Sequence, residues 1–314
     1  MKVTFETESV PMRLLRRFGR DRLAWSLRRL HCPVPRDALV LEVGSGGNPY
    51  ARANVLLDAY EVTRERHWVP LVSDRPTVLG FVENLPFRDQ TFDFVIASHV
   101  LEHSPDPARF LRELQRVARA GYIEVPDAFM ERVNPYRDHR LEITVRENRL
   151  LIRRKPAWRT DPALVELYEP TAKQWIAGET IPRHPFDFHV RHYWQGRIDF
   201  EILDEGVDFD PGDDDGGRAA PQDSGRISPL RNVLSGLRRL LSQRARNSAL
   251  DVVPLLRCPR CHRDGLDRDG PDALLCTGCD TRYPVRNGLM LMQAVKPGAG
   301  LPSQGTCTPP CAAG

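Results

Sequence analysis

The chain has 314 residues, of which 41% are hydrophobic and 28% charged, and its formal net charge is +3 at pH 7. This length allows one sizeable α/β domain and a smaller unit. The near balance of charges argues neither for nor against a polyanionic partner. No apolar run approaches the roughly 20 residues of a membrane-spanning helix, and the N-terminus lacks the apolar stretch of a signal peptide. We therefore expect a cytoplasmic protein without a membrane span.

The N-terminal segment, residues 1–36, is rich in arginine and is predicted to be helical. Apolar residues recur within it at intervals that place them on one side of one or two amphipathic helices. These residues are Leu14, Leu15, Phe18, Leu23, Leu27 and Leu30.

The stretch LVLEVGSGGNPYARANVLLD, residues 39–58, begins as a buried strand and a glycine-rich turn, and its second apolar run ends at Asp58. A dinucleotide-binding loop would carry a third glycine where Pro49 stands, and would need a helix to hold the pyrophosphate. The connection is too short for such a helix, because parallel strands usually need a dozen or more connecting residues. We therefore expect that NAD does not bind.

A nucleoside without phosphates suits this loop better. Glycines let a ligand lie against the backbone, and a carboxylate at the end of the second strand can accept two hydrogen bonds from a ribose diol. S-adenosylmethionine is such a ligand. Its amino-acid end would lie over Gly44, Ser45 and Gly46 with Glu42 below, and its ribose would meet Asp58. The alternative is a glycine turn between two core strands that binds nothing.

Strand-like and helical patterns alternate over residues 39–126, which indicates an α/β fold with a parallel sheet and helices on its faces. Residues 92–97 are almost all apolar, as in a central parallel strand. A helix is predicted to follow, with Asp106 as its N-cap residue and Gly121 at its end. Ligands of such sheets bind at the carboxyl ends of the strands.

The sequence VENLPFRDQTFDFVIASHVLEHSPDPARFLRELQRVARAGYIEVPD, residues 82–127, resembles the class I S-adenosylmethionine-dependent methyltransferases that carry an LPF…D…FD…VLEH signature. The resemblance covers residues 38–127. It implies a Rossmann-like methyltransferase sheet with helices on both faces, formed here by residues 37–204, and S-adenosylmethionine as the cofactor.

The resemblance also assigns cofactor contacts to residues at the strand ends. Adenine would lie against the loop from Val82 to Leu85, and the strand that ends at Ser98 would lie under the cofactor. The segment VLEH, residues 100–103, would cap the site. Where the family often has an acidic residue just before ENLPF, this chain has Phe81.

Three histidines are candidates for a general base, since histidine suits proton transfer near neutral pH. They are His139, His99 and His103. His139 follows the predicted fifth strand together with Tyr136 and Asp138, where methyltransferases of this class usually build the acceptor pocket. The alternative for each histidine is a structural hydrogen-bonding role.

The rest of the predicted catalytic domain alternates apolar and polar residues. Residues 141–152 are predicted to form a hairpin. The segments FHVRHYW, residues 188–194, and RIDFEIL, residues 197–203, are predicted to form a final pair of strands, because aromatic and β-branched residues favour strands. Histidines in this region could line the acceptor site or bind a metal, namely His184, His189 and His192.

Composition changes after this domain. Residues 205–228 are acidic and rich in glycine and proline, which predicts a flexible linker. Residues 229–249 carry leucines at helical spacing among arginines and are predicted to form an amphipathic basic helix. The tail, residues 296–314, is predicted to be disordered.

Four cysteines form two C-x-x-C pairs separated by fourteen residues, Cys258 with Cys261 and Cys276 with Cys279. In a reducing compartment this spacing predicts a closed tetrahedral zinc site, and redox-active pairs are the alternative. The surrounding residues 252–292 resemble the small zinc-ribbon proteins that activate certain tRNA, rRNA and translation-factor methyltransferases. The resemblance implies a zinc ribbon over residues 250–295 that contacts the catalytic domain. Cys32, Cys307 and Cys311 have no predicted ligand role.

Together these features predict an S-adenosylmethionine-dependent methyltransferase with a fused structural zinc ribbon. We expect the acceptor to be a small molecule or a glycan or lipid precursor. One alternative is an RNA or protein methyltransferase whose ribbon engages the macromolecule. Another is a binding or scaffold protein that keeps the fold without catalysis, which the departure at Phe81 would favour.

Overall fold

The structure, a computed structural model, describes residues 5–63, 66, 68–155, 166, 168–203, 236 and 242–293. The predicted linker and tail lie outside the described residues, and so does most of the predicted basic helix at 229–249. The last part of that helix is α10, Arg244–Ala249. In these described ranges no helix is long and apolar enough to cross a membrane.

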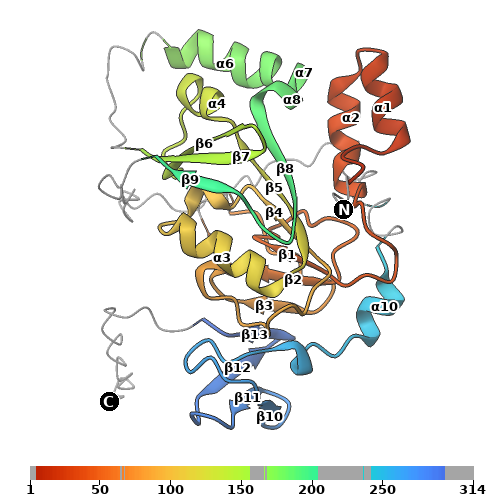
Figure 1. The fold of residues 1–314 in the computed structure, drawn as a ribbon, viewed down its shortest axis with the longest axis vertical. Coiled ribbons are helices and arrows are strands. Elements are labelled where there is room, and N and C mark those ends of the chain that lie inside the picture. Colours follow the sequence, from red (N-terminus) through yellow and green to blue (C-terminus); the bar gives the residue numbers. More distant parts are fainter. Residues whose placement is uncertain are drawn as a thin grey trace, which may run out of the picture.

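A ten-stranded sheet runs through the molecule in the order β10-β11-β12-β13-β3-β2-β1-β4-β5-β8 (Figure 1). The strands β3, β2, β1, β4 and β5 are mutually parallel, and β8 is antiparallel to β5. The predicted α/β class with a parallel sheet is therefore confirmed. The bounds are β1 Val40–Val43, β2 Val55–Asp58, β3 Thr77–Leu79, β4 Phe94–Ser98, β5 Ala120–Pro126 and β8 His189–Gln195.

Two hydrophobic clusters cover the two faces of this sheet, because successive side chains of a strand point to opposite faces. Leu41 and Val95 belong to the larger cluster, which also contains the apolar side of helix α3, Pro107–Val117. Val40 and Phe94 belong to the smaller cluster. In that cluster Phe5, Cys32 and Val34 of the N-terminal segment pack against the sheet.

The connection between β1 and β2, residues 44–54, contains no helix, as its length predicts. The N-terminal segment covers the face that a crossover helix would otherwise bury. It contains α1 Val10–Arg17, α2 Asp21–Leu27 and the short 3-10 helix η1 Arg28–Leu30. The loop between the two strands, which carries Gly44 and Gly46, therefore has no crossover helix.

Helix α3 begins as predicted but ends earlier. The Asp106 side chain accepts a hydrogen bond from the Arg109 backbone N–H at 2.9 Å, and Pro107 occupies the first turn. The prediction that Gly121 ends this helix was wrong, because Gly121 lies within β5. A Cβ atom there would lie 2.6 Å from the Val95 carbonyl oxygen and 2.7 Å from the Trp194 indole nitrogen. Close packing of neighbouring strands therefore requires this glycine.

A second sheet has three strands in the order β6-β7-β9, Leu141–Arg146, Arg149–Arg154 and Phe200–Ile202. The hairpin of β6 and β7 confirms the prediction for residues 141–152. The predicted pairing of the last two strands was wrong, because β8 joins the large sheet whereas β9 runs parallel to β7. Gly196, with φ +71°, follows β8 and lets the chain turn away from the large sheet.

Short helices complete the N-terminal part of the structure, which comprises the described residues up to 203. They are η2 Val82–Asn84, η3 Leu101–His103, α4 Ala128–Val133, α6 Lys173–Trp175, α7 Ile181–Arg183 and α8 Pro185–Phe188, with π-helical turns at Tyr168–Ala172 and Ile176–Thr180. Of these, η2 and η3 follow strands β3 and β4, so they lie at the carboxyl edge of the sheet.

The C-terminal unit continues the large sheet instead of standing apart from it (Figure 1). It contains the 3-10 helix η6 Val253–Leu255 and the strands β10 Leu266–Arg268, β11 Ala273–Cys276, β12 Arg282–Arg286 and β13 Leu289–Leu291. Strand β13 pairs in parallel with β3, with Met290 opposite Val78. The unit also contacts the N-terminal part at a backbone bridge between Phe87 and Leu256.

Candidate functional site

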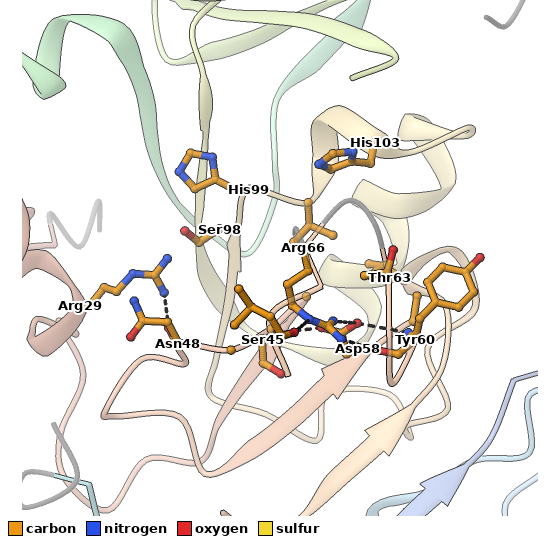
Figure 2. A pocket seen from close by; sticks show the side chains of 17 residues that line it. Arg29, Ser45, Asn48, Asp58, Tyr60, Thr63, Arg66, Ser98, His99 and His103 are labelled. Carbon is orange, nitrogen blue, oxygen red and sulfur yellow. Dashed lines mark hydrogen bonds and ion pairs between the residues drawn. The ribbon is translucent and has the colours of Figure 1, made fainter. Parts of the chain in front are cut away.

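A cavity of about 380 Å³ opens at the carboxyl ends of β1, β2 and β4 (Figure 2). Eight residues singled out from the sequence line it, namely Gly44, Ser45, Gly46, Asp58, Val82, Ser98, His99 and His103. They come from four separate strand ends, which the fold brings to one edge of the sheet. The cavity is also lined by Arg29 and Arg66, which the sequence did not single out.

The glycine loop after β1 has a backbone that favours glycine. Gly44 and Gly46 have φ values of +63° and +57°, in the left-handed region that side chains with a Cβ rarely adopt. A Cβ atom on Gly44 would lie 2.1 Å from a methyl carbon of Val100. The VLEH segment therefore packs directly against the glycine loop.

Asp58 ends β2 and faces the cavity with a side chain that is largely buried. One carboxylate oxygen accepts a hydrogen bond from the Gly46 backbone N–H at 2.9 Å, and the other accepts one from the Tyr60 N–H at 3.2 Å. This second oxygen also lies 3.0 Å from a guanidinium nitrogen of Arg66. Asp58 thus fixes the glycine loop and pairs with a cation inside the cavity.

Arg66 is held by several acceptors at once (Figure 2). Besides Asp58, its guanidinium donates to the backbone carbonyl oxygens of Tyr60, Glu61 and Val69, at 3.2, 2.7 and 2.8 Å. Its aliphatic stem lies close to Gly46, where a Cβ atom would meet the Arg66 Cδ at 3.2 Å. No local sequence signal indicates this position, because Arg66 is one arginine among many in an irregular loop.

Two predicted cofactor residues do not line the cavity. Glu42 is fully buried below the loop, where its carboxylate accepts a hydrogen bond from the Tyr50 N–H at 2.7 Å. Burial raises the pKa of Glu42 to about 7, although the nearby charge of Arg29 opposes this. Leu85 is buried as well, and its backbone N–H donates to Glu113 at 2.8 Å. Both residues support the walls of the cavity from behind.

His99 lies between two buried carboxylates at the upper rim. Its Nδ1 is 3.4 Å from Glu102, and its Nε2 is 3.3 Å from Glu124. Burial alone would lower the pKa of His99, but its contacts with these two carboxylates and their negative charges raise it to about 9. An imidazolium cannot accept a proton, so His99 is poorly suited to act as a base at neutral pH.

Glu124 anchors this rim to the N-terminal segment. Its carboxylate accepts hydrogen bonds from Arg28 at 2.9 and 3.1 Å and from the Ser98 hydroxyl at 3.0 Å. Burial would raise the pKa of Glu124, but the charges of Arg28 and His99 hold it well below its usual range. Ser98, a predicted cofactor residue, therefore donates its hydroxyl hydrogen bond to a structural partner, Glu124.

His103 and His139 lie together, with ring centres 4.8 Å apart. His103 lines the cavity, whereas His139 is buried behind it and stacks on Tyr136 at 4.7 Å. The three histidines that could line an acceptor site or bind a metal, His184, His189 and His192, do not form one cluster. His184 is exposed, and His192 is buried within β8. His189 lies 5.4 Å from the His99 ring.

The four predicted zinc ligands converge at the other end of the molecule. The sulfur atoms of Cys258, Cys261, Cys276 and Cys279 all lie within 4.8 Å of one another. The Cys258–Cys279 and Cys261–Cys276 sulfur atoms are 3.7 and 3.6 Å apart. Hydroxyl groups of Tyr283 and Thr281 lie 3.0 and 3.1 Å from two of these sulfur atoms. Cys32 lies in the N-terminal segment, and Cys307 and Cys311 lie outside the described residues.

The cysteine-bearing unit contacts the chain segment that leads to the cavity. The Arg88 and Arg257 N–H groups donate to the Leu255 and Pro86 carbonyl oxygens at 3.0 and 3.1 Å. The Asn84 side chain donates to the Pro259 carbonyl oxygen at 2.8 Å. Asn84 directly precedes the LPF motif, residues 85–87, and Pro86 lies within it, while Val82 in the same segment lines the cavity. The LPF segment therefore lies between the two halves.

Comparison with known proteins agrees with this architecture. Residues 41–123 match the family described as a methyltransferase domain. An uncharacterized protein of Methanocaldococcus jannaschii is 28% identical over 91 residues, which are 29% of this chain and 43% of that protein. Norajmaline N-methyltransferase of Rauvolfia serpentina is 44% identical over 43 residues, 14% of this chain and 15% of that enzyme. The matches thus span less than half the length of either relative.

Solved structures are similar over parts of the chain. A SAM-dependent methyltransferase from Thermotoga maritima has 22% identity and a TM-score of 0.27, covering 37% of this chain and 60% of its own. The Haloferax volcanii complex of the Trm112 methyltransferase activator with a methyltransferase has 17% identity and a TM-score of 0.35, covering 62% of this chain and 100% of the matched one. The family match spans 83 of the 314 residues of this chain.

Proposed function

We propose that the protein is an S-adenosylmethionine-dependent methyltransferase that acts on a small molecule or on a glycan or lipid precursor. One observation carries the proposal: the left-handed glycine loop, the Asp58 carboxylate and the Ser98 strand end line a single cavity. A nucleoside needs backbone that it can approach closely and a hydrogen-bond acceptor for its ribose hydroxyls. The glycine loop and Asp58 provide both at the carboxyl edge of the sheet.

The residues of the cavity fit such a cofactor after one rearrangement. Gly44 and Gly46 leave room for its amino-acid end, where Arg29 supplies a cation for the carboxylate. Asp58 would accept hydrogen bonds from the ribose hydroxyls. Its Arg66 partner would have to release it, because a guanidinium occupies one of its oxygens at 3.0 Å.

Bound S-adenosylmethionine supplies a sulfonium methyl group with an already activated leaving group, so positioning provides much of the catalysis. The chain contributes the glycine loop, the carboxylate at Asp58 and the rim of the cavity around Val100. Where an acceptor hydroxyl must lose its proton, His103 is the candidate base that lines the cavity.

We also propose that the four cysteines hold a structural zinc ion. Four thiolates around zinc at about 2.3 Å would be about 3.8 Å from one another, close to the sulfur separations of 3.6 and 3.7 Å. A site closed by four thiolates leaves no position for catalysis. Its function would be to stabilise a unit that pairs with β3 and with the LPF segment.

Binding of S-adenosylhomocysteine by isothermal titration calorimetry tests the proposed cofactor site. We expect Asp58→Ala to weaken binding by about tenfold to 150-fold, because hydrogen bonds to charged groups contribute about 1.5–3 kcal/mol. Asp58→Asn keeps the shape and loses only the charge. Asp37→Ala, at an exposed position, is the matched control and should bind normally.

Thermal melting of each variant separates loss of the ligand contact from loss of folding, since Asp58 also holds the Gly46 and Tyr60 N–H groups. Wild-type protein that does not bind S-adenosylhomocysteine at millimolar concentration would contradict the proposal and favour a scaffold without catalysis. Unchanged affinity in folded Asp58→Ala would remove that residue from the site.

A further inference from the structure

We propose that Glu102, His103 and His139 form a second metal site, which binds a divalent transition-metal ion at the rim of the cavity. Their ligand atoms, one carboxylate oxygen and two imidazole nitrogens, all lie within 4.8 Å of one another. Two histidines with one carboxylate make a set typical of sites that keep coordination positions open. The cluster belongs to the N-terminal part of the structure and is separate from the four cysteines.

The hydrogen bonds of both histidines orient them as metal ligands. His103 Nδ1 lies 3.0 Å from the Asp138 carbonyl oxygen, and His139 Nδ1 lies 2.7 Å from the Glu131 carboxylate. Carbonyl and carboxylate oxygens only accept, so each Nδ1 carries the proton and leaves a lone pair on Nε2. Metal-ligating histidines almost always have such a partner on the other nitrogen, which fixes the tautomer and the ring orientation.

Glu102 supplies the independent evidence for a ligand. Its side chain is 2% exposed, and among the described residues both of its carboxylate oxygens are buried without a hydrogen-bond partner. Its nearest cation is His99, whose Nδ1 lies 3.4 Å from one oxygen. Burying a carboxylate with so few partners is costly, and buried charges are normally paired or coordinate metals. A metal ion would satisfy both oxygens.

The surrounding charges are compatible with a cation. Glu131, which orients His139, is itself paired with Lys155, whose Nζ lies 2.5 Å from its other oxygen. The Glu131 carboxylate thus orients His139 and is neutralised by Lys155, so it is not itself counted as a metal ligand. Ligand atoms around an ion at about 2.1 Å stand about 3.0–3.4 Å apart. Since the three ligand atoms now lie up to 4.8 Å apart, they would move closer by up to about 1.8 Å on binding.

The position of the site suggests its use, and this part rests on the proposed methyl transfer. His103 belongs both to this cluster and to the lining of the cavity. In the metal-bound protein it would hold the ion and would not act as the base. An ion with three protein ligands has coordination positions left for an oxygen of the acceptor. The site would therefore select acceptors with a metal-binding oxygen, such as neighbouring hydroxyl groups or a hydroxy acid, and would hold them beside the cavity.

Cobalt titration of the full-length, zinc-loaded protein tests the site without any methyl acceptor. We expect one Co²⁺ to bind per chain while the zinc content stays constant. The absorption spectrum should lack the intense sulfur-to-cobalt charge-transfer band that cysteine ligands produce. Glu102→Gln and His139→Asn should each weaken cobalt binding at least tenfold. His184→Asn, at an exposed histidine, is the matched control and should bind cobalt normally.

Titration of S-adenosylhomocysteine on the same variants shows whether each remains folded and keeps the cofactor site separate from the metal site. Cobalt binding without S-adenosylhomocysteine binding would sustain the metal site and refute the methyltransferase proposal. The metal site is refuted if wild type takes up no cobalt at millimolar concentration. Cobalt that only displaces zinc from the cysteines, or that binds folded Glu102→Gln and His139→Asn as tightly as wild type, refutes it equally.

Discussion

Replacing His99 by asparagine should remove a pH-dependent part of the stability. His99 lies 3.4 and 3.3 Å from Glu102 and Glu124, and these contacts raise its pKa from 6.5 to about 9. Its φ of +59° is one that asparagine tolerates better than most residues, so His99→Asn removes the charge with little added backbone strain.

The sign and size of the effect follow from the raised pKa. The folded state holds the proton more tightly than the unfolded state, so the stabilisation is fully present below pH 6.5 and is lost as the pH rises through about 9. A shift of this size sets an upper bound of about 3 kcal/mol. Because the His99 side chain is 35% exposed, solvent screening reduces the expected contribution to about 1–2 kcal/mol.

Urea denaturation of wild type and His99→Asn at pH 6, 7 and 10 measures this contribution. The difference in free energy of unfolding between the two proteins should be about 1–2 kcal/mol larger at pH 6 than at pH 10. Taking the difference cancels groups that titrate alike in both proteins. His184→Asn, which removes an exposed imidazole, serves as the matched control. Parallel pH profiles for wild type and His99→Asn would refute the assignment of His99 as an ion-pair partner of the two buried carboxylates.

Two further predictions concern ligands. NAD should not bind, because the connection from β1 to β2 contains no helix whose N-terminus could hold a pyrophosphate, and micromolar binding in calorimetry would contradict this. Wild type should contain one zinc ion per chain by atomic emission, and Cys276→Ser should lose most of it. Its affinity for S-adenosylhomocysteine should fall by less than about tenfold, because none of the described residues of the C-terminal unit lines the cavity, although that unit shares the large hydrophobic cluster with the rest of the sheet. Loss of all cofactor affinity in folded Cys276→Ser would show instead that the ribbon shapes the cavity directly.

The local pattern of the sequence was enough to predict the parallel sheet and several of the residues that line the cavity. Continuous apolar runs define β1, β2 and β4, since buried parallel strands need apolar side chains on both faces. The carboxyl ends of parallel strands meet at one edge, so Gly44, Asp58 and Ser98 could be expected there together. The cysteine spacing likewise indicated one cluster, because two C-x-x-C turns can bring four sulfur atoms together.

Contacts between distant segments were decided only by the tertiary structure. The pairing of β13 with β3 joins residues about two hundred positions apart, and strand edges carry no sequence signal for their partner. Arg66 reaches Asp58 from an irregular loop, where no periodicity indicates the direction of a side chain. The meeting of Glu102 and His103 with His139 depends on how β5 and α4 return the chain to η3. Sequence periodicity determines which face of an element is buried, whereas packing determines which polar groups from different elements become neighbours.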